Sequence, residues 1–245
     1  MEERLEEQLN VISASQVLLF SRCPYALYLK LQTKEETPMM LSGTLFHRLV
    51  ELRLKGYSKE EAIGIATEEF INQTFFPEAM RNAMQFYSSY EKTLEEILEE
   101  GVLTVEKKFT LEIDGITIVG YIDFITRKRK MVELKSTKFN RPLPEFKHIF
   151  QLSVYALTEE ADEYYLHYVF PNKVEIIKAQ ILPRGEVVGL IKSVVKLLEA
   201  NEFPPLGMLS GYCQFCAYKK LCKYYDLTDK VKLWYNKEGE KEVQL

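Results

Sequence analysis

The side chains with the clearest chemical potential lie in two short segments of the middle of the chain. Asp123 stands inside an otherwise apolar run, and Glu133 and Lys135 flank Leu134 shortly afterwards. Side chains alternate faces along a β-strand, so Glu133 and Lys135 share one face of the expected strand while Val132 and Leu134 enter the other. A hairpin pairing between the two segments would bring Asp123 beside Glu133.

Two adjacent buried carboxylates predict a bound cation, because burying them together costs free energy unless a cation neutralises them. Hard oxygen ligands suit Mg²⁺ or Mn²⁺, which can polarise a phosphate and lower the pKa of a bound water. Lys135 would then hold the attacking water or offset charge that builds on the phosphate. These residues predict a phosphodiesterase site. The alternative is that Glu133 and Lys135 form an ordinary ion pair on a half-exposed strand.

A histidine on an earlier helix is a further candidate ligand. Gly43, His47 and Glu51 follow one another at four-residue spacing and line one stripe of that helix. A neutral imidazole there could bind the same cation, although a packed, hydrogen-bonded core histidine is the alternative. His148 and His167 have no comparable surroundings and are interpreted as structural or surface residues.

Gln151 and Tyr155 are also four residues apart, on a helix that otherwise packs inward. They could orient Lys135 or contact a phosphate. The alternative is a satisfied polar pair at a helix edge.

The four cysteines predict a metal centre. Cys213 and Cys216 form a CxxC pair, Cys222 follows, and Cys23 lies near the other end of the chain. In a reducing compartment such thiols are metal ligands or catalytic groups more often than disulfides. A centre that includes Cys23 would tie the two ends together, and metal binding would carry folding free energy. A three-cysteine zinc site and a free, buried Cys23 are alternatives, and the spacing fits zinc and iron–sulfur equally.

Composition narrows the class of protein. The 245 residues are 47% hydrophobic and 28% charged, as in ordinary globular domains, and the formal net charge is −4. That charge argues against binding nucleic acid through bulk positive charge, so any DNA contact must be local. No apolar run approaches the roughly 18 residues of a membrane span, and the first residues are acidic, so we expect a cytoplasmic protein. The candidate basic residues for local contacts are Lys107, Lys108, Arg127, Lys128, Arg129, Lys130, Lys135, Lys138, Arg141, Lys147, Lys219, Lys220 and Lys223.

Hydrophobic periodicity predicts that the first hundred residues are helical and that strands and helices are mixed in the rest of the chain. Helical patterns cover the first hundred residues, with a capping box at residues 58–61 and a helix over 77–100. The period changes to two from Val102, where Asp114-Gly115 predicts a hairpin turn, and a third strand follows the basic turn at residues 127–130. The later expected elements are a helix over 145–158, strands over 163–170 and 174–182, and a helix over 185–201.

Taken together, these residues resemble the RecB-like nucleases that carry a cysteine cluster, and most closely the fourth CRISPR-associated protein family. The resemblance covers nearly the whole chain. It rests on the following positions in family order: Cys23, Gly43-x-x-x-His47, Gly120-Tyr121-Ile122-Asp123, Glu133-Leu134-Lys135, Gln151-x-x-x-Tyr155, and Cys213-x-x-Cys216 with Cys222.

The resemblance implies an α/β (α+β) fold with a PD-(D/E)xK restriction-endonuclease-like core. It implies a mixed sheet flanked by helices, with the helical N-terminal region and the cysteine-rich C-terminal region packed together. We expect one nuclease domain over 1–245, made of a helical part (1–101), a nuclease core (102–201) and a cysteine-rich part (202–245) that closes on Cys23.

The resemblance also implies the site. Metal is expected on His47, Asp123, Glu133 and the backbone carbonyl of Leu134, with Asp123, Glu133 and Lys135 catalytic and with Gln151 and Tyr155 near the DNA. An iron–sulfur cluster, usually 4Fe-4S, is expected on Cys23, Cys213, Cys216 and Cys222.

The expected function is a metal-dependent exonuclease that degrades mainly single-stranded DNA ends from 5′ to 3′, in CRISPR spacer acquisition beside integrase proteins. Two alternatives stay open: an end-processing nuclease of repair or recombination, and a non-catalytic iron–sulfur adaptor that binds DNA. Whether the chain forms a homo-oligomer is also open.

Overall fold

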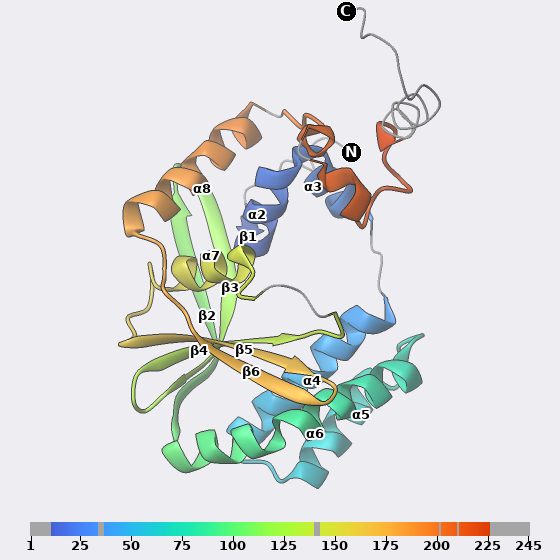
Figure 1. Cartoon of the computed structure of the whole chain (residues 1–245), viewed down its shortest axis with the longest axis vertical. Coiled ribbons are helices and arrows are strands. Elements are labelled where there is room, and N and C mark those ends of the chain that lie inside the picture. The colour runs from blue at the N-terminus through green and yellow to red at the C-terminus, as the bar shows by residue number, and fades with distance from the viewer. Residues whose placement is uncertain (1–10, 34–36, 140–142, 201, 210, 226–245) are drawn as a thin grey trace, which may run out of the picture. The chain divides into compact units, whose positions relative to one another are not determined.

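A computed structural model describes residues 11–33, 37–139, 143–200, 202–209 and 211–225 (Figure 1). Contacts along the chain group into two compact units. Unit 1 consists of Met1–Lys34, Ile113–Ile116 and Leu190–Leu245, and unit 2 consists of Glu35–Glu112 and Thr117–Gly189. Each unit is described on its own. The prediction of one nuclease domain over the whole chain stays a prediction.

Three helices form one layer of unit 2. They are α4 (Pro38–Leu54), α5 (Lys59–Phe70) and α6 (Phe76–Glu100). The predicted capping box begins α5, since the Ser58 side chain accepts from the Glu61 amide and the Glu61 side chain accepts from the Ser58 amide. Helix α6 ends at Gly101, whose φ of 82° lies in a region that glycine adopts at little cost.

The strands of unit 2 form a mixed sheet, as predicted. They are β2 (Val102–Ile113), β3 (Ile116–Thr126), β4 (Lys130–Ser136), β5 (Glu163–Phe170) and β6 (Lys173–Lys178). Strand β2 pairs with β3, and the path continues in the order β3, β4, β5, β6. The β3–β4 and β5–β6 pairs are antiparallel, whereas β4 and β5 run parallel. The crossover between the parallel strands contains helix α7 (Phe146–Tyr155).

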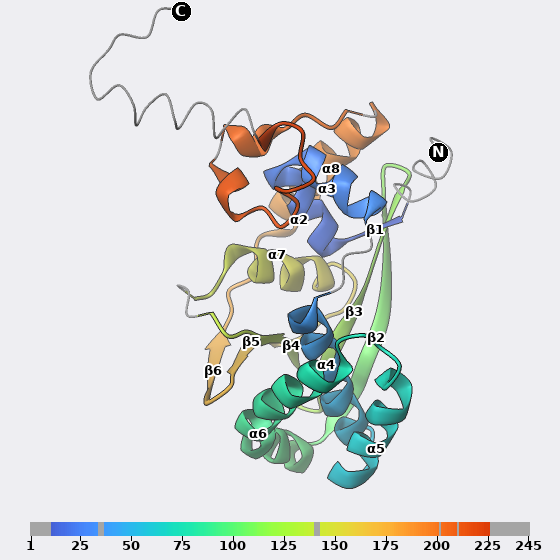
Figure 2. The same cartoon turned by 90° about the vertical axis from the view of Figure 1, so that its right-hand side faces the viewer.

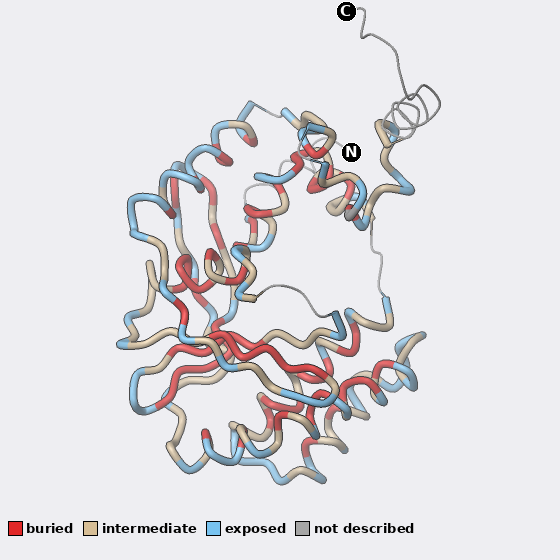
Figure 3. The backbone as a smooth tube through the Cα atoms, viewed as in Figure 1, coloured by how far each residue is buried: buried red, intermediate tan, exposed pale blue. Residues whose placement is uncertain are grey.

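The two faces of this sheet are covered by different helices, with α4, α5 and α6 on one side and α7 on the other (Figures 1 and 2). The main core contains residues of α4 and α6 together with buried residues of the strands, and Figure 3 shows long buried stretches in these elements. Val132 and Leu134 pack into this core, so Glu133 and Lys135 point to the other face of β4. The strand residues of the core are Phe124, Val132, Leu134 and Val169, and its large helical members include Phe46, Phe86, Tyr87 and Tyr90.

Unit 1 joins the N-terminal helices to the C-terminal segment. It contains β1 (Val11–Ser13), α2 (Ala14–Arg22), α3 (Pro24–Gln32), and the 3₁₀ turns η1 (Leu206–Met208) and η2 (Tyr212–Phe215). Helix α8 (Arg184–Glu199) enters this unit from Leu190 onward. The amide of Tyr25 donates to the carbonyl of Pro204 over 3.4 Å, which links α3 to the C-terminal segment.

The predicted element pattern is confirmed with two differences. The short strand β1 was missed, because three residues are too few to establish an alternating pattern. Strand β6 ends at Lys178, four residues before the predicted end; beyond the Tyr165↔Lys178 pair, the Ala179 amide makes one more hydrogen bond to the Tyr164 carbonyl of β5. Arg141 and residues 226–245 of the cysteine-rich part lie outside the described residues. Among the described helices, none combines the length and apolar character that a membrane crossing requires.

Candidate active site

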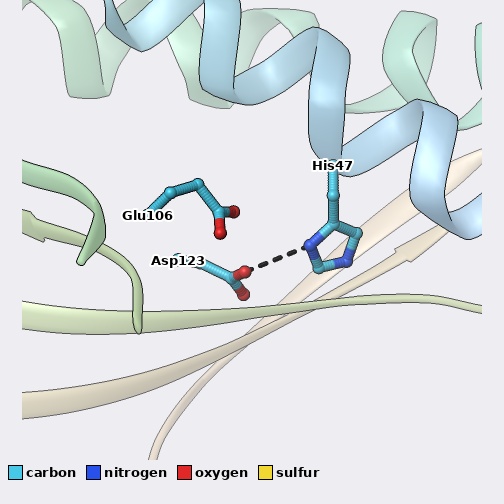
Figure 4. A group of neighbouring side chains, drawn as sticks. All are labelled: His47, Glu106 and Asp123. Carbon is cyan, nitrogen blue, oxygen red and sulfur yellow. Dashed lines mark hydrogen bonds and ion pairs between the residues drawn. The ribbon is translucent and has the colours of Figure 1, made fainter. Parts of the chain in front are cut away.

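Three polar side chains converge in unit 2 as a group that could hold a metal ion. His47, Glu106 and Asp123 each offer a ligand atom, and these atoms lie within 4.8 Å of one another. Figure 4 shows His47 reaching from helix α4 toward Asp123, with the Glu106 carboxylate approaching the same space. His47 Nδ1 lies 3.1 Å from Asp123 Oδ1. The sequence predicted two of these residues, His47 and Asp123.

Asp123 is fixed by the neighbouring strand. The pairs Phe124↔Val132 and Ile125↔Met131 define an antiparallel register whose continuation by one residue places Asp123 opposite Glu133. Asp123 Oδ2 accepts a hydrogen bond of 2.6 Å from the backbone amide of Leu134. The predicted pairing of the two carboxylate segments is therefore present. The role predicted for the Leu134 carbonyl stays a prediction.

Glu106 was missed, because its role depends on a local distortion of β2. Its φ of 48° is in the left-handed region, which costs a non-glycine residue about 1–2 kcal/mol. Such outliers persist only where the surrounding structure fixes them. One signal was available in the sequence: three consecutive charged residues, Glu106, Lys107 and Lys108, interrupt the alternation of β2.

Glu133 and Lys135 lie outside this three-residue group and contact each other. Lys135 Nζ donates to Glu133 Oε1. Glu133 is 2% exposed, and its other carboxylate oxygen, Oε2, is buried without a hydrogen-bond partner among the described residues. A buried polar atom without a partner costs about 1–3 kcal/mol, more when it is charged. This oxygen is therefore a candidate metal ligand, because a bound cation would supply the partner that it lacks among the described residues.

The carboxyl groups of the site shift one another's pKa values. Burial, together with the charge of Asp123, raises the pKa of Glu106 to about 7 and holds the pKa of Glu133 well above its ordinary value. Burial would raise the pKa of Asp123 as well, but His47, Lys135 and the Leu134 amide lower it overall. Burial opposes protonation of His47, yet the Asp123 carboxylate raises the pKa of its imidazole. The site thus concentrates negative charge that favours a cation.

A pocket of about 440 Å³ gives access to the group. Its lining comes from α4, the last residue of α5, and the interior of strands β2 and β3. Its lining residues are Gly43, Thr44, His47, Arg48, Glu51, Phe70, Glu106 and Asp123. The predicted stripe of Gly43, His47 and Glu51 therefore faces one pocket. A Cβ atom added to Gly43 would lie 3.4 Å from Ser136 Oγ, so glycine lets α4 lie close to the end of β4.

The residues fit a hard divalent cation. Their donors are one imidazole nitrogen and carboxylate oxygens, and Mg²⁺ and Mn²⁺ bind such ligands while keeping open positions for water or phosphate. The partnerless Oε2 of Glu133 supplies an independent indication, since a nearby cation would satisfy it.

Gln151 and Tyr155 are hydrogen-bonded to each other on α7, where the Gln151 side-chain amide donates to the Tyr155 hydroxyl. Tyr155 is 2% exposed, and burial, followed by the charge of Glu133, raises the pKa of its hydroxyl. The predicted roles of this pair, orienting Lys135 or contacting a DNA phosphate, stay predictions, and the burial of Tyr155 favours the first.

The ring of Phe109 packs against Tyr155 at 5.0 Å between centroids. That ring lies over Gly120, where an added Cβ atom would approach to 2.5 Å. Gly120 is therefore required by the close packing of β2 against β3 and α7.

The four cysteines line one cavity within unit 1. Cys23 and Cys216 are buried together with Ala26 and pack against Tyr25 and Tyr212. Burial raises the pKa of the Cys216 thiol, and the charges of the other three cysteines contribute to this rise. A donor set of four neighbouring thiols fits a tetrahedral metal or an iron–sulfur cluster.

Several polar residues considered in the sequence have structural partners. His167 Nδ1 lies 2.7 Å from the Tyr90 hydroxyl, and His148 Nδ1 lies 2.8 Å from that of Tyr168. Both histidines are buried, in agreement with the structural interpretation. Among the basic residues, the following pair with carboxylates: Lys107, Lys128, Arg129, Lys130, Lys135 and Lys147.

Comparison with known proteins identifies the family. A family model described as the PD-(D/E)XK nuclease superfamily matches residues 11–223. The comparison with curated proteins finds no match. A crystal structure of a "Putative exonuclease" from Eubacterium rectale covers 98% of this chain and 93% of its own, with 14% identity and a TM-score of 0.58. The match to the crystal structure of SSO0001 covers 82% of this chain and 93% of that one, with 20% identity and a TM-score of 0.43.

The structural likeness at a TM-score of 0.58 concerns the fold alone. The family match spans most of the chain and includes the residues of both candidate centres. The predicted PD-(D/E)xK fold is confirmed, whereas the closer resemblance to one CRISPR-associated family stays a prediction. The chain belongs to the PD-(D/E)XK nuclease superfamily.

Proposed function

We propose that this nuclease hydrolyses phosphodiester bonds at DNA ends, mainly in single strands, with a divalent cation. The observation that carries the proposal is the convergence of His47, Glu106 and Asp123 in an open pocket. Glu133 and Lys135 give further support. The β3–β4 register, extended by one residue, places Glu133 opposite Asp123, and Lys135 donates a hydrogen bond to Glu133. A protein that only binds DNA would gain nothing from these buried carboxylates that offsets the cost of placing them together.

His47, Glu106, Asp123 and the Oε2 atom of Glu133 are the residues that would hold the cation. When bound, Mg²⁺ or Mn²⁺ polarises a phosphate oxygen and lowers the pKa of a bound water. Lys135 places an ammonium beside Glu133, where it offsets negative charge that builds on the phosphate. The Leu134 amide keeps the Asp123 carboxylate oriented, because it donates to Oδ2.

Unit 1 would carry an iron–sulfur cluster, 4Fe-4S in the resembled family, on Cys23, Cys213, Cys216 and Cys222. The single cavity that these thiols line supports a four-thiolate centre. Zinc accepts the same ligands, so the metal must be identified by measurement. Anaerobically purified protein with a broad absorbance band near 400 nm, expected from the resemblance, would support iron–sulfur. A colourless, zinc-loaded protein would contradict it.

The resemblance further suggests 5′ to 3′ polarity and a role in CRISPR spacer acquisition beside integrase proteins in the cytoplasm. End-processing in repair or recombination is the alternative setting. Strands labelled separately at the 5′ and 3′ ends distinguish the two polarities by the length of the first products.

The deciding experiment is digestion of end-labelled single-stranded DNA by wild type and Glu133→Ala, in Mg²⁺, Mn²⁺ and EDTA. We expect cleavage by wild type alone, blocked by EDTA. Full activity of a folded Glu133→Ala protein would contradict the assigned role of Glu133. DNA binding without cleavage by either protein would favour the non-catalytic adaptor.

A further inference from the structure

One polar residue interrupts the buried face of helix α6. Asn82 is 8% exposed, and it shares that face with Ala79 and Phe86, which are both fully buried. A buried side-chain amide has to be hydrogen-bonded, and an apolar residue of similar shape at such a position folds about as well or better. The stability of the core therefore gives no reason for asparagine at position 82.

Asn82 contacts side chains from two other parts of unit 2. Its Nδ2 donates to Ser42 Oγ of α4 over 3.3 Å, and its Oδ1 accepts from Lys138 Nζ over 2.7 Å. The Ser42 hydroxyl itself donates to the carbonyl of Pro38, so Ser42 does not depend on Asn82 for a partner. The main effect of the Asn82 amide is therefore to hold the ammonium of an otherwise exposed lysine beside α4.

Two contacts place Lys138 next to the wall of the candidate active-site pocket. Ser42, the second residue from Lys138 in this hydrogen-bonded chain, directly precedes Gly43, which lines the pocket together with His47. The end of β4 approaches the same wall, because a Cβ atom added to Gly43 would lie 3.4 Å from Ser136 Oγ. Lys138 follows Ser136 by two residues, which span at most ~7 Å. The lysine therefore lies beside the part of α4 that lines the pocket.

The charge of Lys138 is not offset in the way that the charges of neighbouring lysines are. Lys107 pairs with Glu159, and Lys135 pairs with Glu133. Within the described part of the chain, no carboxylate pairs with Lys138, whose ammonium contacts the neutral amide of Asn82. A DNA strand that reaches the pocket brings phosphates, and a lysine ammonium complements a phosphate without reading the base.

We infer that Lys138 binds a backbone phosphate of the DNA strand that enters this pocket, and that Asn82 is the positioning residue that holds its ammonium there. This inference rests on the proposed function. A lysine that is already held in place loses less side-chain freedom when DNA binds, so Asn82 increases the affinity of the contact. Because the contact is to the backbone and lies outside the metal ligands, it acts on binding of the strand and not on the chemical step.

The first test measures binding of single-stranded oligonucleotides by fluorescence anisotropy in Ca²⁺ at several NaCl concentrations, and steady-state cleavage in Mg²⁺. Lys138→Ala should weaken binding about fivefold for every sequence and reduce the salt dependence by about one ion. Its KM should rise by a similar factor, with kcat close to that of wild type. Lys138→Arg should keep the wild-type salt dependence. The control is Lys178→Ala, which removes an exposed lysine that pairs with Glu163 and should bind like wild type.

The second test separates positioning from folding at Asn82. Asn82→Leu should melt at or above the wild-type temperature, because an apolar side chain replaces a buried amide while Ser42 keeps its bond to Pro38. It should nevertheless weaken DNA binding about threefold, although Lys138 is intact. In the Lys138→Ala background the same substitution should cause no further loss of binding, since Asn82 acts through Lys138. If leucine prevents folding, Asn82→Ala removes the same two hydrogen bonds and should show the same loss and the same dependence on Lys138.

The outcomes distinguish this inference from the proposed function. Metal-dependent cleavage by wild type, together with an unchanged KM and salt dependence in Lys138→Ala, overturns the inference and leaves the nuclease intact. An equal loss of binding from Asn82→Leu with and without Lys138 overturns the positioning role, because Asn82 would then act by another route. If wild type neither binds nor cleaves single strands, the inference and the proposed function fail together.

Discussion

The two units hold their candidate centres by different means. In unit 2 the oxygen and nitrogen ligands sit at the edge of a large hydrophobic core that exists without them, built around residues such as Phe86 and Tyr90. In unit 1 two of the ligands, Cys23 and Cys216, are themselves members of a small buried cluster with Ala26, beside other buried residues such as Phe20 and Leu27. We therefore expect that a metal can be removed from the first centre without unfolding unit 2, whereas removing it from the second centre destabilises unit 1.

The largest effect is expected at the cysteines. Cys216→Ser should prevent loading of the centre and unfold unit 1, because structural metal sites contribute on the order of 10 kcal/mol to folding. Limited proteolysis with mass spectrometry should then find new cuts in Met1–Lys34 and Leu190–Leu245 and few in unit 2. Lys135→Ala, which leaves the thiols intact, is the control. If Cys216→Ser showed the same proteolysis pattern as wild type, the thiols would not be needed for the folding of unit 1, and the expected difference between the units would be wrong.

The opposite behaviour is expected in unit 2. Lys135→Ala should reduce the rate of DNA cleavage about 10²–10³-fold, the usual loss when a charge-stabilising donor is removed. Its melting temperature should fall by several degrees because the buried Glu133 Oε1 loses its partner, but unit 2 should stay folded around its hydrophobic core. Parallel loss of activity and of folded structure would show that the two centres do not differ in the way described.

One glycine in each unit allows the tightness of packing in the two units to be compared. Gly120→Ala should destabilise the protein by about 1–3 kcal/mol, since an added Cβ atom would lie 2.5 Å from the Phe109 ring that supports Tyr155. Gly207→Ala should cost less, because its nearest contact, Cys23 Cβ, lies at 3.3 Å. Chemical denaturation measures both changes. A larger loss in Gly207→Ala would mean that unit 1 is packed more rigidly than unit 2.

The smallest effect concerns Glu106 in metal-free protein. Its pKa is raised from 4.5 to about 7, so the folded state binds the proton more tightly than the unfolded state. Stability should therefore fall as pH rises from about 4.5 to about 7, by on the order of 1 kcal/mol, since solvent reaches the partly exposed Glu106 and reduces the full effect of the pKa change. The free energy of unfolding of Glu106→Gln should lack this pH dependence. Chemical denaturation of both proteins at the two pH values in EDTA measures the difference. Mn²⁺ should stabilise wild type more than the variant.

The sequence predicted the parts of the fold that depend on local rules. The Asp114-Gly115 turn established the β2–β3 hairpin, and the following strand brought Glu133 toward Asp123. The spacing of Cys213, Cys216 and Cys222 predicted that they hold one metal centre, which stays a prediction, and the three thiols line one cavity. These features need only turn chemistry, strand alternation or short spacing.

Other features could not be derived locally. Glu106 joins the site through a backbone conformation that its own sequence disfavours, so periodicity alone assigned it no role. The parallel β4–β5 pair depends on a crossover through α7, which alternation within each strand does not encode. The convergence of Cys23 with the C-terminal thiols depends on the tertiary fold; the cysteine count offered it as one of several alternatives, and the resemblance implied it.

The left-handed backbone at Glu106 has a consequence for protein design. A sequence optimised for stability alone would place glycine at position 106, because glycine relieves the backbone cost and removes a carboxylate from beside Asp123. Such a redesign would gain stability and erase a ligand without disturbing any core contact. Stability-guided engineering of this nuclease should therefore keep position 106 fixed, even though its left-handed backbone favours glycine there.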